Sequence, residues 1–172
     1  HDAGTQRPVQ PMGCQAANLN HQITRFGGFF IGLTMTKRTL IRQALADRVG
    51  LELNNVPGAK PVTVFANRPF SIDQEDLPVA FCYMMEGTPS EYALDKPGDS
   101  AQLMVSLYVM ESNQADAELD VLAENLDPLA GDNLNGLLDE GLELANWSYG
   151  IDEQGTGLAS LTLTFNASWS NN

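Results

Sequence analysis

Residues 161–169, LTLTFNASW, alternate apolar and polar side chains from end to end. A period of two is typical of a β-strand with one buried and one exposed face. The same signal predicts strands over residues 102–111 and, more weakly, over residues 61–66 and 144–151. Residues 77–86 carry apolar side chains on both faces, which predicts a strand in a central place in its sheet.

Two stretches carry apolar side chains at helical spacing, residues 36–49 and residues 113–126. Gly50 is a natural C-terminal stop for the first helix. Asn113, followed at a short distance by Asp116, is expected to cap the start of the second helix.

The order of these segments predicts an α+β fold, with a mixed, mostly antiparallel β-sheet and two main helices packed on one face. Residues 87–100 are rich in turn formers and are expected to form a long loop. The leucine-rich residues 134–144 are interrupted by glycines and are expected to form a short helix and a loop. A length of 172 residues and a hydrophobic fraction of 43% suit one domain with a substantial core.

Residues 1–34 differ from the remainder because they are rich in Gln, Asn, Gly and Pro and show no amphipathic period. Two interpretations stay open. The segment is either upstream or cloning sequence, or an N-terminal arm that docks Phe29 and Phe30 onto a neighbouring subunit. The domain itself is expected over residues 35–172. The apolar stretch at residues 29–33 is far shorter than the roughly 20 residues that cross a membrane, so no membrane association is expected.

Negative charge is concentrated in the C-terminal half of the chain. The net charge is −13, and residues 97–172 contain no Lys or Arg. Such a surface repels nucleic acid, since phosphates bind to basic side chains. It also repels other copies of the chain, so self-association would depend on shape and apolar contact.

The residue patterns that catalysis or cofactor binding require are missing from the sequence. Both histidines, His1 and His21, lie in the atypical N-terminal segment, and neither a phosphate-binding loop nor a zinc-ligand spacing is present. We therefore expect no enzyme activity, no cofactor and no metal. Paired carboxylates can hydrolyse glycosides or bind a cation, but a solvated surface is the favoured interpretation of both acidic clusters. These clusters are Asp73, Glu75 and Asp76, and Asp139, Glu140 and Glu143.

Three further side chains have expected structural roles. Cys82 lies in an apolar run and is expected to be a buried free thiol. Trp147 and Trp169 are expected to be core or edge anchors rather than sugar-binding platforms.

A series of short motifs runs through the chain from residue 35 onward. The motifs are a helix starting at Thr36, VFANRP at 64–69, DLPVA at 76–80, Glu91-Tyr92, a strand at 102–109, AELD at 117–120 and YGID at 149–152. In this order they resemble the lambda-type tail terminators of long-tailed phages, the minor tail protein U family. The first 34 residues and the leucine-rich stretch depart from the family pattern.

The resemblance implies a homo-oligomer, a hexameric ring, with the tail tube protein on one face and the head-completion (connector) protein on the other. The ring would cap the tail tube, terminate its polymerisation and provide the head-joining surface. This places the chain in the virion, at the head-proximal end of the tail, after assembly in the host cytoplasm. DNA would only pass through the channel, and no cofactor or active site is implied.

Two hypotheses concern the negative charge. Part of it lines the channel, so that DNA slides without adhering, or it simply keeps the free monomer soluble. Because copies at −13 repel one another, salt or divalent cations are expected to promote assembly by screening.

Three residues are predicted to contribute to subunit contacts besides the two phenylalanines. Tyr92 and Leu94 are apolar side chains in a polar loop and are plausible contact anchors, unless they tuck back onto their own domain. Arg68 is expected either to pair with acids of a neighbour or to brace the turn before Pro69.

The competing functions are another head–tail connector or tail tube structural protein and, less favoured, a carboxylate-dependent hydrolase.

Overall fold

The computed structural model describes residues 35–55, 60–69, 71–90, 98–150 and 157–171. These residues form an α+β domain with two helices and five strands, as predicted. The elements are α1 (Lys37–Asn54), β1 (Thr63–Phe65), η1 (Gln74–Asp76), β2 (Val79–Ser90), β3 (Gly98–Met110), α2 (Ala115–Glu124), η2 (Asp127–Leu129), β4 (Glu143–Gly150) and β5 (Leu158–Ser170). The labels η1 and η2 denote short 3₁₀ helices.

The five strands form one mixed, mostly antiparallel sheet in the order β1-β2-β3-β5-β4. β1 runs parallel to β2, whereas the other three pairs are antiparallel. The edges of the sheet are unlike. At one edge, β1 contributes only three residues, which pair with Val79–Phe81 of β2. At the other edge, β4 pairs along its length with β5.

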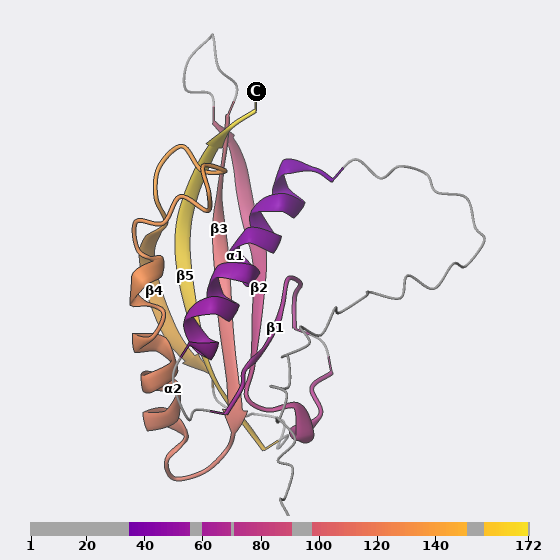
Figure 1. The fold of residues 1–172 in the computed structure, drawn as a ribbon, viewed down its shortest axis with the longest axis vertical. Helices are drawn as coiled ribbons and strands as arrows, with labels where there is room; N and C mark the ends of the chain where they lie inside the picture. The colour runs from indigo at the N-terminus through magenta and orange to yellow at the C-terminus, as the bar shows by residue number, and fades with distance from the viewer. Residues whose placement is uncertain (1–34, 56–59, 70, 91–97, 151–156, 172) are drawn as a thin grey trace, which may run out of the picture. The chain divides into compact units, whose positions relative to one another are not determined.

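Both helices pack on the same face of the sheet, as predicted, with α1 lying diagonally across the strands and α2 beside it (Figure 1). Their contacts divide the sheet, since α1 touches β1 and β2 whereas α2 touches β3 and β5. In α1, apolar residues at helical spacing are fully buried in one cluster with the strands. These residues are Ile41, Leu45, Val49 and Leu53. Burial of this stripe stabilises the helix on the sheet.

Cys82 belongs to the same core and is completely buried. It is a free cysteine, and burial raises the pKa of its thiol, so the group is neutral and acts as a small apolar side chain. The prediction of a buried free thiol is therefore confirmed. Trp169 is also confirmed as a core anchor, with only 1% of its surface exposed.

The opposite face of the sheet has a smaller apolar cluster and a polar strip. Val79 and Phe81 are buried there, and the rings of Phe65 and Phe81 stack at 5.2 Å. Further along the sheet, hydroxyl groups of Ser106 and Thr162 are 2.8 Å apart across β3 and β5. β2 thus has both faces buried in its first half, as predicted.

The predicted end of the first helix at Gly50 is wrong, because α1 continues to Asn54. The extra turn buries Leu53 in the core, which offsets the roughly 1 kcal/mol that a glycine costs within a helix. Asn54 then fixes the helix end, since its side-chain amide donates to the carbonyl oxygens of Gly50 and Val62 at 3.0 Å each. Tertiary contacts override the local stop signal at this position.

The predicted loop over residues 87–100 is too long. β2 extends to Ser90 and β3 begins at Gly98, so the ends of this stretch are paired strands. The register shifts between Met84 and Gly87, and a Cβ at Gly87 would lie 3.1 Å from the carbonyl oxygen of Ser100. Gly87 therefore permits the close approach that lets the hairpin continue past the bulge.

Two further expectations about local structure are corrected. Asn113 does not cap the second helix, which begins at Ala115; Ser112 instead accepts a hydrogen bond from the backbone of Gln114 at 3.2 Å. The leucine-rich residues 134–144 form turns and the start of β4 rather than a short helix. Leu134 and Asn135 have φ values of 50° and 61°, which place both in the left-handed region and interrupt any right-handed helix.

Candidate interaction site

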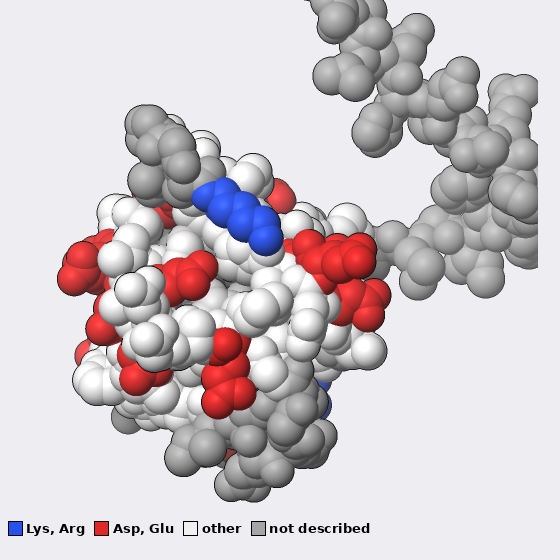
Figure 2. Space-filling view, turned by 90° about the horizontal axis from the view of Figure 1, so that it is seen from below, with Lys and Arg blue, Asp and Glu red and all other residues white. Residues whose placement is uncertain are grey.

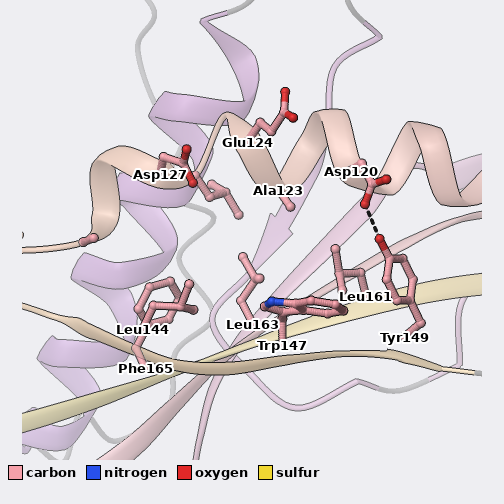
Figure 3. Close-up of a pocket in the computed structure, with 12 residues that line it drawn as sticks. Asp120, Ala123, Glu124, Asp127, Leu144, Trp147, Tyr149, Leu161, Leu163 and Phe165 are labelled. Carbon is pink, nitrogen blue, oxygen red and sulfur yellow. Dashed lines mark hydrogen bonds between the residues drawn. The ribbon is translucent and has the colours of Figure 1, made fainter.

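A groove of about 500 Å³ lies between α2 and the edge strand β4 (Figure 3). Its floor comes from β4 and β5 and its upper wall from α2 and the segment after it. The groove is lined by Asp120, Ala123, Glu124, Leu126, Asp127, Ala130, Leu144, Trp147, Tyr149, Leu161, Leu163 and Phe165. Among the described residues, several large apolar side chains of this groove are exposed to solvent.

The groove exists because α2 lies over β3 and β5 and leaves β4 partly uncovered. Alternate residues of β4 face the helix layer, with Trp147 opposite Leu163 and Tyr149 opposite Leu161. Trp147 is 61% exposed and Tyr149 is 40% exposed. Their rings meet edge to face at 5.8 Å, so they form one aromatic unit. Exposed aromatic pairs of this kind are enriched at protein interfaces.

The rim of the groove is acidic. Asp120, Glu124 and Asp127 stand along its helical side. The hydroxyl of Tyr149 donates a hydrogen bond to Asp120, and this bond is the largest of the causes that raise the pKa of Tyr149 to about 12. The bond joins β4 to α2 and holds the tyrosine ring in place. No Lys or Arg occurs in residues 97–172, so the rim acids have no cation nearby in sequence.

Further acidic side chains are exposed at the end of the molecule where α2 begins. Seen from below, acidic side chains form several separate patches and basic side chains are few (Figure 2). The two clusters singled out in the sequence are part of the solvated surface, because all six carboxylates are exposed. In the described segments, no three His, Cys, Asp or Glu side chains come together to hold a metal ion. The groove itself combines an apolar floor with an acidic rim.

The residues predicted from sequence to make contacts do not lie in the groove. Arg68 is exposed in the segment that follows β1, at the opposite edge of the sheet. Tyr92 and Leu94, like Phe29 and Phe30, lie outside the described residues.

Sequence reasoning missed the groove, although it expected Trp147 to be a core or edge anchor. The available signal was the spacing of Trp147 and Tyr149, which lie two residues apart and therefore on one face of the predicted strand over residues 144–151. That pattern fixes a face but does not tell whether a helix covers it.

Comparisons with known proteins identify the family. The model of the phage minor tail protein U family matches residues 36–169, which include both the groove and Arg68. The chain belongs to the phage minor tail protein U family. It is a structural protein of a phage tail and a component of the virion. The family is not one of enzymes.

Two solved structures are similar to this minor tail protein U chain at low sequence identity. One is a chain of the virion of a native gene transfer agent particle, with 15% identity, a TM-score of 0.46, and coverage of 78% of this chain and 94% of that one. Another solved chain has 20% identity, a TM-score of 0.48, and coverage of 77% and 94%. No curated protein matches the chain. None of the helices described is both long and apolar enough to span a membrane.

Proposed function

We propose that this minor tail protein U chain assembles into a closed ring, a hexamer, that caps the tail tube and terminates its polymerisation. The family membership over residues 36–169 is the observation that carries the proposal. The two unlike edges of the sheet, β1 and β4, support the proposal. A head-to-tail contact between unlike surfaces generates a ring when the rotation between neighbours closes.

A cap of this kind works through surfaces alone. One face of the ring matches the last tube ring, and the opposite face receives the head-completion protein. Each subunit edge is occupied by a neighbour, so a closed ring leaves no lateral edge on which polymerisation continues. The acidic surface supports a channel through which DNA passes without adhering, because its charge repels phosphate.

The proposal is tested with purified protein and the tail tube protein of the same phage. Light scattering and negative-stain images should reveal a closed ring of fixed size. Added to polymerising tube protein, the ring should shorten the tubes in proportion to its concentration. A variant of the tube protein that does not polymerise is the control for nonspecific binding.

The competing structural roles give different results in the same assay. A chain that stacks into tubes by itself is a tube protein, which contradicts the proposal. A ring that leaves tube length unchanged but binds the head-completion protein is a connector of another kind and also contradicts it.

A further inference from the structure

We infer that the groove between α2 and β4 receives a second copy of this chain, which inserts Arg68 from the opposite edge of its sheet. This inference rests on the proposed ring and names the surfaces that join its subunits.

The groove requires a partner that brings positive charge. Glu124 and Asp127 stand on the rim, and the ion pairs within the described residues involve neither of them. The floor on the other side of the groove is apolar and includes the exposed ring of Trp147. An arginine suits both demands, since its planar guanidinium stacks on an aromatic face and pairs with carboxylates at the same time.

Among the described residues, one exposed guanidinium has no ion pair within its own chain. Lys37 and Lys60 donate to the carbonyl oxygens of Ser170 and Leu77. Two arginines form ion pairs. Arg38 pairs with Asp99, and Arg48 pairs with Glu52 and Asp132.

Two arginines are left without an acidic partner among the described residues, Arg42 and Arg68. Arg42 is half-buried and donates to the hydroxyl of Thr39 at 3.4 Å. Arg68 is exposed, in the short segment after β1 and beside Pro69. It is therefore the cation in the described structure that is best placed to meet another molecule.

The position of the two surfaces favours a ring over a pair. β1, which leads into Arg68, and β4, which floors the groove, form opposite edges of one sheet (Figure 1). A two-fold pair built on the groove alone would bring acidic rim against acidic rim. Head-to-tail contact instead brings the Arg68 edge of each copy to the acidic groove of the next, so charge complementarity sets the direction of the ring.

Charge reversal at either surface tests the inference on the full chain. Arg68→Glu places a carboxylate against the acidic rim, and Glu124→Lys removes part of the rim charge and repels Arg68. Each variant alone should weaken the contact between neighbours at least about 30-fold, as expected for a broken interfacial charge pair. Glu140→Lys is the matched control, because it makes the same change of charge at an exposed acid outside the groove and should leave the ring intact.

The decisive experiment combines the two charge reversals. An equimolar mixture of Arg68→Glu and Glu124→Lys chains should regain rings, since each altered surface meets its complement. The double variant Arg68→Glu/Glu124→Lys should form rings by itself. Each variant should unfold at the same temperature as the wild type, because both side chains are exposed. That result establishes that the variant monomers are folded.

The outcomes separate this inference from the proposed function. Rings that persist in both single variants overturn the Arg68 contact while the capping role stands. Normal rings of Glu124→Lys that fail to cap tubes show that the groove faces the tube protein, which also overturns the inference. A wild-type chain that forms no ring and leaves tube growth unchanged refutes the proposed function itself.

Discussion

Replacement of Trp147 by alanine should dissociate the ring while leaving the monomer folded. Trp147 is 61% exposed, and a tryptophan side chain has a surface of up to about 250 Å², so about 150 Å² remains for a neighbour to cover. If a neighbour covers two thirds of that, about 100 Å² at about 25 cal/mol per Å² corresponds to about 2.5 kcal/mol. The dissociation constant of each subunit contact should then rise about 60-fold.

The assay is light scattering over a dilution series, which gives the concentration at which rings fall apart. Thermal unfolding of the same variant should change little, because an exposed side chain contributes less than about 0.5 kcal/mol to monomer stability. Met110→Ala is the matched control, since Met110 is 49% exposed and lies on the sheet face away from the helices. Rings of Trp147→Ala that survive dilution as well as wild-type rings would refute the reasoning.

Four other predictions concern the fold and its charge. Leu119→Ala should destabilise the domain by about 2–5 kcal/mol in urea unfolding, because Leu119 of α2 is fully buried; a loss below about 1 kcal/mol would contradict the described packing. Gly87→Val should destabilise the hairpin by about 1–3 kcal/mol, because a Cβ there already lies 3.1 Å from the carbonyl oxygen of Ser100; unchanged melting would be inconsistent with the bulge. The pKa of Tyr149 is raised to about 12 in the folded state, so the stability that its neutral hydroxyl contributes is present below the tyrosine pKa of about 10 and is lost as pH rises towards 12. Tyr149→Phe should remove that part of the loss of stability at alkaline pH. Identical pH profiles of stability for the variant and the wild type would argue against the bond to Asp120. Raising the ionic strength from about 0.01 M to 0.15 M shortens the screening length from about 30 Å to 8 Å, so it should promote ring formation between chains of charge −13. Sedimentation that is independent of salt would count against this repulsion.

Elements whose apolar side chains recur at a regular spacing could be predicted from the sequence, because that spacing identifies the buried face. Leu161 to Trp169 alternate within β5, and Leu45 and Val49 mark the buried stripe of α1. The ends of elements could not be predicted where tertiary contacts decide them. Gly50 looks like a stop but lies inside α1, because the next turn buries Leu53.

The candidate site was harder to predict for a physical reason. Trp147 and Trp169 occur in similar polar surroundings in the sequence, yet one is 61% exposed and the other 1%. The difference comes from the sheet order, which places β4 at an edge that α2 does not fully cover. Arg68 was recognisable from sequence as a contact candidate, but only the topology places it across the sheet from an acidic groove.

The mass of the wild-type chain in solution, measured by light scattering as its concentration is raised, tests the ring most directly. A self-limiting assembly of unlike edges predicts one fixed multiple of the 18.7 kDa chain that stops growing once it has closed. A mass that stays at the monomer, or one that increases without limit, would contradict the account.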